Sequence, residues 1–583
     1  MKYKFLVTTP LQETWPSKDC KIIFLGEWCK LFTNKNNYEE YDYETLDYHW
    51  DDRKKLEEDY NYLLEFYEKT IKDLAIKMNE IHEVNFSLRY WKILLGPWLS
   101  LLIHSVFDRW EMIQVAINVN KYIETNILIE DKIKWIAFDQ TNFKKLVMED
   151  DGWNNFIYSE IIEFNNDKVK INRLKIPEKK KKIIIKERNT KITFWRIYHF
   201  IAKLFSFKNN SFIISSYLNK IDETILSFRL FQLPLFINPN STKIFLPQQK
   251  LRKWKIEKKT VSRFEKFILK IIPKQIPTIY LEGYQSLNHE VKVFNWKKNP
   301  KSIFTSNSIH NDEIFKHFVG ANENSKLVIG QHGGSYGISK LHFLEYHELS
   351  ITDKYISWGW VNKDFKSKII PLGQITKRKK PKIKLNNSKL VIIMLCNSRY
   401  SYYLSSLSIS SQWLNYFNDQ VDLITKLNND IKNNTIIRLY KKDYGWSSIS
   451  RFKEIFNNLE YDEGEIGIEK HYPQTKLFIA TYDSTSYLEN FGLNLPTILF
   501  WDNSIFEMKD YVKPLFNELK KVKVYHESPE SAAEFINENW ENIDDWWNSN
   551  AVKNAIERFN NSVNKQNNNI INDLSKILST CIT

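Results

Sequence analysis

The chain has 583 residues, a formal net charge of +14 and 26% charged residues. A single hydrophobic core does not normally stabilise a chain of this length, so the length favours two to four domains. The four cysteines form no C-x-x-C pair and no regular framework, which argues against a disulfide scaffold and for a reducing compartment. We expect no signal peptide and no transmembrane helix, since no stretch approaches about 18 uncharged apolar residues. The expected location is the cytoplasm.

The positive charge is compatible with three kinds of partner: nucleic acid, an anionic membrane surface, or a phosphate-bearing substrate. The clearest lysine runs are 179–182 and 377–382. No nucleic-acid-binding motif accompanies them, so we expect no nucleic-acid partner. A solvated loop or linker is the first expectation for each run. Peripheral contact with the anionic inner face of the inner membrane is the second.

In chain order, the pattern of the first part of the sequence predicts two strands followed by helices. The strands span residues 4–8 and 21–25, and residues 52–82 have the periodicity of a long amphipathic helix. Residues 85–125 predict further helices, with the apolar run 93–107 as a buried helix. The Lys- and Asn-rich stretch 163–210 predicts an insertion or an exposed segment.

Short apolar runs then alternate with helix-length segments. The predicted strands are 212–214, 278–281, 302–305, 326–329, 354–358, 390–395, 435–439, 477–480, 497–500 and 522–525. Such alternation indicates parallel β-α-β units. The fold class is therefore α/β, with two doubly wound Rossmann-like domains facing a cleft and helical additions. We expect domains at 1–375 and 376–540, a basic linker at 376–388, and carboxy-terminal helices at 541–583.

The most informative segment, 477–500, predicts a strand, a tight polar loop, a helix and a strand. Asp483, Ser484 and Thr485 fall at the helix start, where first-turn amides and the helix dipole favour an anion such as a donor phosphate. Glu489, one turn on, could accept hydrogen bonds from sugar hydroxyls. An ordinary capped crossover helix would have the same pattern.

A second segment follows the strand at 326–329. His332 precedes the paired glycines Gly333 and Gly334, with Ser335 after them. Paired glycines permit close backbone approach to a ligand, and a histidine can donate to a phosphate or carry a proton. We expect all four residues to contact a donor, with His332 also a catalytic candidate.

A third segment follows the strand at 435–439. Arg438 and Lys441 could bind phosphate, and Tyr440 could stack on a base. A solvated basic loop is the alternative. Carboxylates at predicted strand ends could act as a general base, and we favour Glu27, then Glu13.

Other chemistries are excluded by their missing motifs. The sequence has no G-x-x-x-x-G-K-[ST] loop, no early G-x-G-x-x-G and no H-E-x-x-H. The Asp-x-Asp metal pattern is not evident either. We therefore expect no cofactor and no metal, with phosphate charge neutralised by Arg438, Lys441, His332 and helix amides.

Together these motifs resemble the transferases of O-antigen and other surface-polysaccharide gene clusters, which look like the two-domain GT-B glycosyltransferases. The resemblance runs nearly end to end and rests on segments 24–29, 95–98, 282–284, 331–337, 357–360, 438–446 and 483–489. The carboxy-terminal set is also similar to capsule transferases that use CMP-activated acidic sugars. The resemblance implies a donor nucleotide in the second domain and an acceptor in the first.

The function expected from this resemblance is transfer of a sugar from a nucleotide-activated donor to a glycan or lipid-linked glycan acceptor. A CMP-linked acidic sugar would suit the positive charge. Two alternatives stay open: a polyol-phosphate transferase of the glycerophosphate type, and a glycan-binding assembly factor without turnover.

Overall fold

The computed structural model describes residues 4–120, 122–165, 167–175, 211–235, 243–258, 261–294, 296, 299–376 and 388–580. Both lysine runs, 179–182 and 377–382, and most of the expected linker lie outside these ranges. Within them, no helix is both long enough and apolar enough to cross a bilayer.

Three parallel sheets organise the described chain. Sheet A has the order β3-β2-β1-β4-β5, sheet B the order β10-β9-β8-β7-β6, and sheet C the order β13-β12-β11-β14-β15-β16. The strands are β1 (Lys4–Val7), β2 (Ile22–Phe24), β3 (Tyr43–Thr45), β4 (Ile123–Leu128), β5 (Val169–Leu174), β6 (Ser211–Ile213), β7 (Ser302–Thr305), β8 (Lys326–Gly330), β9 (Lys354–Ser357), β10 (Ile369–Pro371), β11 (Lys389–Ile393), β12 (Thr435–Arg438), β13 (Glu460–Asp462), β14 (Thr475–Ala480), β15 (Thr497–Phe500) and β16 (Tyr525–His526). Helices cover the sheets, as the buried apolar strands of parallel sheets require.

The described α-helices vary from single turns to two helices of 30 and 32 residues. They are α1 (Lys35–Tyr38), α2 (Arg53–His82), α3 (Leu88–Val119), α4 (Gln140–Glu149), α5 (Asp151–Phe164), α7 (Lys220–Arg229), α8 (Arg263–Gln275), α9 (Tyr284–Val293), α10 (Glu313–Ala321), α11 (Phe343–Ile351), α12 (Gln412–Lys426), α13 (Asn429–Asn433), α14 (Ser448–Ile455), α15 (Thr485–Leu493), α16 (Lys513–Lys521), α17 (Pro529–Asn539), α18 (Ile543–Asn548), α19 (Asn550–Val563) and α20 (Ile570–Thr580).

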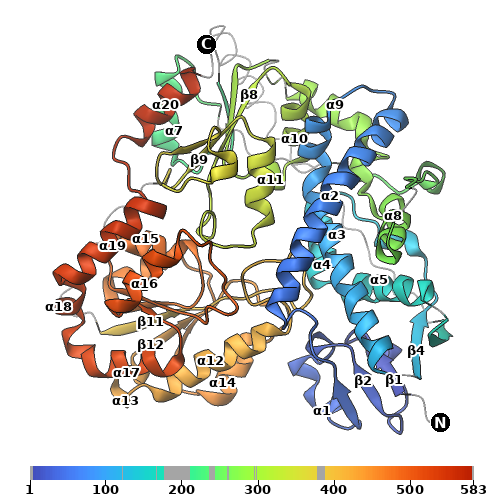
Figure 1. Ribbon diagram of the computed structural model, residues 1–583, viewed down its shortest axis with the longest axis horizontal. Coiled ribbons are helices and arrows are strands. Elements are labelled where there is room, and N and C mark those ends of the chain that lie inside the picture. Colours follow the sequence, from blue (N-terminus) through green and yellow to red (C-terminus); the bar gives the residue numbers. More distant parts are fainter. Residues whose placement is uncertain are drawn as a thin grey trace.

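The long helices α2 and α3 form the centre of the molecule. Asp52 caps α2 by accepting hydrogen bonds from the backbone N–H groups of Lys54 and Lys55. Helix α3 is apolar around most of its circumference, and residues on all its sides are buried. Figure 1 shows both helices running between sheet B at the top, sheet A at the lower right and sheet C at the lower left.

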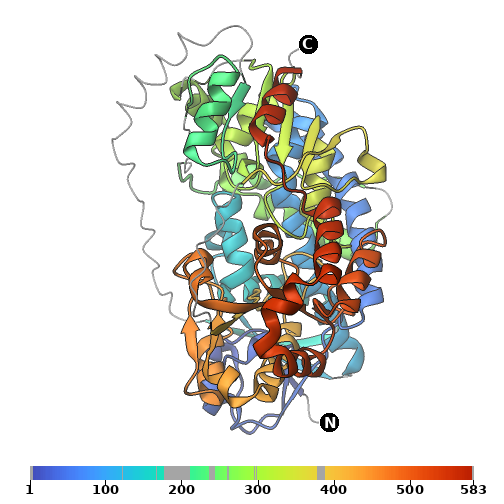
Figure 2. The same cartoon turned by 90° about the vertical axis from the view of Figure 1, so that its left-hand side faces the viewer.

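The carboxy-terminal helices divide between two sheets. Helix α19 packs against α15 and α16 of sheet C, through Phe559 among other residues. Helix α20 instead buries Ile570, Leu574 and Leu578 against strands of sheet B. Figure 2 shows this last helix, in dark red, at the top beside the green elements of sheet B. The expected segment 541–583 therefore ties the two sheets together.

The α/β class with parallel sheets and helical additions is confirmed. The helix expected at 52–82 is α2, and the strands expected at 4–8, 302–305 and 497–500 are β1, β7 and β15. The stretch 1–375, expected as one Rossmann-like domain, holds two separate sheets, A and B.

Three element predictions are wrong, one of them the strand at 522–525, of which only Tyr525 belongs to β16 while residues 522–524 form a turn. Residues Thr278–Tyr280 form a buried 3-10 turn, because the amides of Thr278 and Ile279 donate to the carbonyls of Ala137 and Phe138 and not to a strand. The helical stretch expected to reach residue 125 ends at Val119, and Ile123–Leu128 is the strand β4, whose alternating burial fits a strand.

The carboxyl edges of the sheets converge. In sheet C, Ile393 at the end of β11 pairs with Arg438 on one side and Ala480 on the other. The loop after β11 touches sheet A, where the Arg399 guanidinium donates to the Trp28 carbonyl over 2.7 Å. The loop after β8 touches the loop after β14, as described below. Ligands of open α/β sheets bind at such edges.

Candidate functional site at the junction of sheets B and C

The loop that follows β8 is held in place by a buried glutamine. The Gln331 Oε1 atom accepts hydrogen bonds from the Trp358 backbone N–H at 2.9 Å and from Trp360 Nε1 at 2.7 Å. Its Nε2 atom donates to the Gly333 carbonyl at 2.8 Å. Gly337 then turns the chain with a φ of +75°, in a place where a Cβ atom would strike Trp360. The residues between Gln331 and Gly337 are thus fixed on the sheet.

This loop packs directly on the start of α15. A Cβ atom on Gly334 would lie 2.4 Å from the Ser484 carbonyl carbon and 2.6 Å from the Thr485 nitrogen, so only glycine fits. Further along, Ser339 Oγ donates to Asp483 Oδ2 at 3.0 Å, and the Tyr487 hydroxyl donates to Asp483 Oδ1 at 2.9 Å. Five of the expected donor and catalytic residues (His332, Gly334, Asp483, Ser484 and Thr485) therefore gather at one junction.

The amino terminus of α15 has no side-chain cap. Ser484 occupies the N-cap position in an extended conformation, but its side chain makes no capping hydrogen bond. The Ser484 Oγ atom is buried and has no hydrogen-bond partner. Burial raises the pKa of Asp483 to about 6. Uncapped first-turn amides beside a buried hydroxyl form the kind of place that binds a phosphate.

A compact cluster of His310, His332 and Glu348 lies on the sheet B side. The His310 Nε2 atom is 2.6 Å from Glu348 Oε1, and His332 Nδ1 is 3.7 Å from the same oxygen. The Tyr336 hydroxyl donates to that oxygen at 2.9 Å. Burial lowers the pKa of His310 to about 3 and that of His332 to about 4, and it raises the pKa of Glu348 to about 7.

The cluster can do two kinds of chemistry. Both imidazoles are neutral at pH 7, so His332 can accept a proton, with Glu348 beside it to stabilise the resulting imidazolium. The candidate ligand atoms of the three residues also all lie within 4.8 Å of one another, and two imidazoles with a carboxylate could hold a divalent cation. His310 Nδ1 is buried without a hydrogen-bond partner.

Lys144, on α4, adds a positive charge from sheet A. Its side chain is exposed to solvent, yet surrounding protein desolvates the ammonium and lowers its pKa. The ammonium group therefore reaches solvent while protein surrounds it closely enough to disfavour its charged form. The Lys144 Nζ atom lies 5.5 Å from the Tyr402 ring centroid, and no carboxylate of the described residues forms an ion pair with it. Its charge also reaches His310, whose pKa it helps to lower.

Of the residues expected to bind the donor after β12, one is bound within sheet C and two line a separate cavity. Arg438 is bound within sheet C, since its guanidinium pairs with Asp462 and donates to the Ile466 carbonyl at 2.8 Å. Tyr440 and Lys441 line a cavity of about 270 Å³ together with Cys396 and Trp413. Lys441 is exposed and pairs with Glu465 at 3.0 Å. Glu489 is half-buried on α15, one turn beyond Ser484 and Thr485.

The remaining candidates differ in how tightly they are held. Ser335 Oγ lies 2.9 Å from His342 Nε2 and is therefore tied to the start of α11, whereas a Cβ atom on Gly333 would make only an ordinary contact with the Tyr336 ring, at 3.5 Å. Glu27 pairs with Lys30 at 2.9 Å in the turn after β2, and that turn contacts Arg399 of sheet C. Glu13 is fully exposed in the turn after β1. The structure does not bring either carboxylate into contact with the β8–α15 junction.

His310, Glu348 and Lys144 were not among the residues expected from the sequence. His310 follows β7, the neighbour of β8, so strand-end polar residues on adjacent strands were the available signal. Glu348 lies in the run Leu341–Glu348, which places two histidines and two glutamates in an apolar context. Lys144 has no sequence signal, because its place depends on how three sheets meet.

Three parallel sheets with converging carboxyl edges, an uncapped helix start and a half-buried imidazole in the adjoining loop define an α/β protein with a candidate anion site. The sequence comparison is more specific. A family model described as LIC12162 family transferase matches residues 4–578. The chain belongs to this transferase family, because the match covers nearly all of it.

Comparison with solved structures gives distant similarities. The chain is similar to a variant of the wall teichoic acid polymerase TagF, with 11% identity over 48% of this chain and 73% of that one, and a TM-score of 0.29. It is also similar to WaaG, a glycosyltransferase involved in lipopolysaccharide biosynthesis, with 10% identity, 51% and 82% coverage, and a TM-score of 0.26. A third is UDP-GlcNAc 2-epimerase from Neisseria meningitidis, with 13% identity, 47% and 77% coverage, and a TM-score of 0.27. No curated protein matches the sequence.

Proposed function

We propose that this transferase is a glycosyltransferase that moves a sugar from a nucleotide-activated donor to a glycan or lipid-linked glycan acceptor. The observation that carries the proposal is the packing of Gly334, two residues after the neutral His332, on Ser484 and Thr485 at an uncapped helix start. Glycosyl transfer needs a site that both holds the leaving phosphate and contains a group that accepts the proton of the acceptor hydroxyl.

In the proposed reaction, the first-turn amides of α15 and the Ser484 hydroxyl hold the phosphate of the donor. The acceptor hydroxyl attacks the anomeric carbon, and the bond from that carbon to the phosphate oxygen breaks. His332 takes the hydroxyl proton, and Glu348 stabilises the imidazolium. Lys144 and the helix dipole offset the negative charge that develops on the leaving phosphate.

The geometry favours His332 over Glu27 and Glu13 as the base, because it is half-buried in the loop that packs on the helix start, whereas Glu27 is ion-paired and Glu13 is exposed. An acidic sugar on a CMP carrier is the donor we propose, on the basis of the net charge of +14 and the unpaired Lys144.

A thermal-shift panel of CMP, UDP, GDP and TDP tests the donor class. One nucleotide should raise the melting temperature, since a ligand at 100 times its Kd stabilises the folded state by about 2.7 kcal/mol. If none does so, the proposal fails. Mass spectrometry of the product then separates a transferred sugar from a polyol phosphodiester.

Metal independence is proposed as well. Turnover should persist in EDTA if the His310, His332 and Glu348 cluster works as a proton relay. Loss of turnover in EDTA, with recovery on adding one divalent cation, would show that the cluster is a metal site instead.

A further inference from the structure

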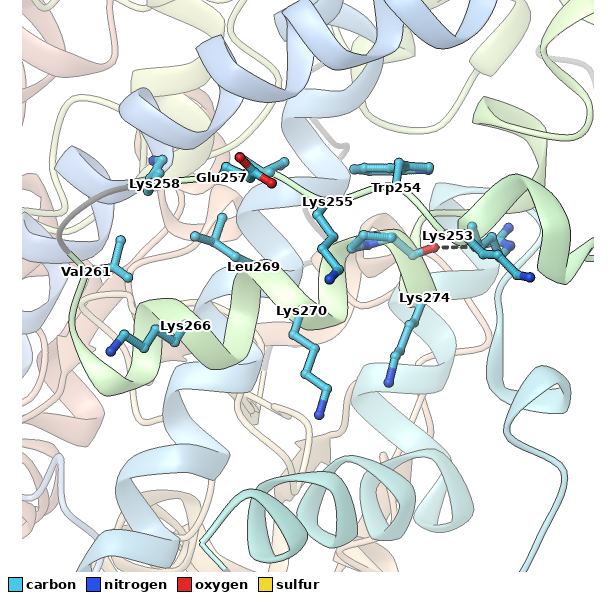
Figure 3. Close-up of a pocket in the computed structure, with 13 residues that line it drawn as sticks. Lys253, Trp254, Lys255, Glu257, Lys258, Val261, Lys266, Leu269, Lys270 and Lys274 are labelled. Atoms are coloured by element: carbon cyan, nitrogen blue, oxygen red, sulfur yellow. Dashed lines mark hydrogen bonds between the residues drawn. The ribbon is translucent and has the colours of Figure 1, made fainter.

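A basic groove lies on a surface remote from the candidate site. It runs between the extended segment 252–258 and helix α8, with a cavity volume of about 1010 Å³. Figure 3 shows this segment alongside the helix, with Lys255 pointing towards α8 and Lys270 and Lys274 leaving the helix on its opposite side. In Figure 1, α8 lies at the right-hand edge, on the far side of α2 and α3 from sheet C.

The local sequence explains why the lysines face solvent. Ser262 and Glu265 form a capping box that starts α8. Its apolar face, including Phe264 and Phe267, is buried against aromatic residues of α2, α3 and α5. Lys266 and Lys270 are one turn apart on the opposite, exposed face. Lys253 and Lys255 alternate with inward residues along the extended segment, as a strand-like chain requires.

Most of this charge is uncompensated. Three other cations of the groove are neutralised: Arg252 by Glu282 at 2.7 Å, Lys258 by Asp73 at 2.9 Å, and Lys274 by Glu160 at 3.6 Å. In the described part of the chain, no carboxylate forms an ion pair with Lys253, Lys255, Lys266 or Lys270. Glu257 is the one carboxylate among the groove's lining residues. Lys253 and Lys255 on the extended segment and Lys266 and Lys270 on the exposed side of α8 thus make the surface around the groove basic, which favours an anionic partner.

Apolar groups accompany the charge. Trp254 is half-buried in the groove, and its Nε1 nitrogen has no hydrogen-bond partner. The chain leading into the groove exposes Leu246 at 73% and Leu251 at 40% of their full surface. Lysines together with exposed leucines and a tryptophan are typical of surfaces that lie in the headgroup region of a membrane. A soluble polyanion would gain little from the leucines.

We propose that the basic groove binds the surface of an anionic phospholipid bilayer. The lysines pair with lipid phosphates, and Leu246, Leu251 and Trp254 enter the boundary between headgroups and acyl chains. Docking by this surface leaves the junction of sheets B and C clear, so the protein can work on a membrane-borne acceptor. The inference stands independently of the proposed reaction, because it uses none of the same residues.

The test is co-sedimentation of the full chain with vesicles of phosphatidylcholine alone and of phosphatidylcholine with phosphatidylglycerol. Wild type should partition onto the anionic vesicles, and added salt should weaken this binding. The variant K253Q/K255Q/K266Q/K270Q should lower the partition coefficient at least about tenfold, since each lysine near such a surface contributes measurably. L246S/L251S should weaken binding as well, with less dependence on salt.

A matched control removes the same charge elsewhere. K453Q/K513Q/K521Q/K553Q changes four exposed lysines in the sheet C region and should bind as wild type does. Equal losses in both quadruple variants would overturn the assignment of the groove, as would equal binding of wild type to neutral and anionic vesicles. Retention on heparin without vesicle binding would overturn it in favour of a soluble polyanion. Thermal unfolding of each variant shows that it is folded.

Discussion

At the scale of single residues, the site depends on groups whose charge is set by burial. His332 is neutral at pH 7 because desolvation lowers its pKa to about 4. A neutral imidazole cannot pair with phosphate as a cation, so its role beside an anion site is to accept or donate one proton. Glu348 has a pKa raised to about 7 and is the neighbouring carboxylate that can stabilise His332 when it holds that proton.

Replacement of His332 tests this role. H332N keeps a polar side chain of similar size but removes the proton acceptor, and we expect kcat to fall by about 10²–10⁴-fold with little change in donor affinity. The measurement is steady-state kinetics with the nucleotide-sugar found in the thermal-shift panel. H289N, at an exposed histidine of α9, is the control and should keep wild-type kcat. Unchanged turnover in H332N would remove this residue from the reaction.

Asp483 gives a pH-dependent test of the junction. Its folded pKa of about 6 is above the ordinary value of 3.8, because burial disfavours the carboxylate. Below pH 3.8 the group is protonated in both states and costs nothing. Between pH 3.8 and pH 6 the unfolded chain loses this proton while the folded protein keeps it, so the cost to stability grows to about 3 kcal/mol and stays at that level above pH 6.

D483N removes that cost and keeps the geometry for contacts with Ser339 and Tyr487. The melting temperature of D483N relative to wild type should therefore increase from pH 4.5 to pH 8. D422N, at an exposed position of α12, should show a difference that does not depend on pH in this way. A D483N difference that stays flat across this range would mean that Asp483 is not desolvated.

At the scale of elements, the site consists of one loop and one helix start that fit together through a glycine. The loop after β8 is anchored by Gln331 at one end and by Ser339 at the other. Helix α15 offers its first-turn amides without a side-chain cap. Neither element forms the proposed anion site alone, so the close contact at Gly334 sets how the loop after β8 lies against the start of α15.

Two adjacent glycines allow a matched experiment on this contact. In G334A the new methyl group would meet backbone atoms of Ser484 and Thr485, which cannot move as a flexible side chain can. We expect a loss of about 1–3 kcal/mol in the free energy of unfolding and a higher KM for the donor. In G333A the nearest atom is a Tyr336 ring carbon at 3.5 Å, so stability should change little. Thermal unfolding and kinetics of the pair measure both effects, and equal losses in the two variants would contradict the packing described.

The elements were predictable from sequence where a local pattern decides them. The period of the apolar residues in α2 predicted that helix to within a residue, and apolar runs after turns predicted β7 and β15. The run Thr278–Leu281 has the same composition but forms a turn, because its backbone partners are Ala137 and Phe138, more than a hundred residues away. No local pattern contains that information.

The residues of the site, like the elements, were predictable only where a local sequence pattern marks them. A histidine before two glycines and a Ser-Thr helix start are local signals, and the structure brings them together. Arg438 also has a local signal, yet Asp462 and the Ile466 carbonyl occupy its guanidinium. Lys144 lacks any signal, since its chemical setting arises where α4 approaches Tyr402 and Tyr440 of sheet C.

At the scale of the whole molecule, three sheets share one hydrophobic centre, and polar contacts between them fix their relative placement. Sheet C meets α2 through Arg53, whose guanidinium pairs with Glu507 at 2.6 and 2.8 Å. The same group donates to Gln412 Oε1 and to the Ile505 carbonyl. Glu507 precedes Met508, which bridges to Ser339 of the loop after β8. Arg53 is therefore linked, through Glu507 and Met508, to the loop after β8 without lying in the candidate site itself.

Removal of this arginine should loosen the junction without touching the site. R53A leaves Glu507 partly buried without its partner, which we expect to cost about 3 kcal/mol in the free energy of unfolding. The donor KM should rise because α15 and the loop after β8 are no longer held in register, while the pH dependence of kcat stays that of His332. The neighbouring K54A changes an exposed cation and should alter neither quantity. If R53A binds donor as wild type does, the interface with α2 has no part in shaping the site. If it loses kcat but keeps KM, Arg53 acts on the chemistry and not on the placement of the sheets.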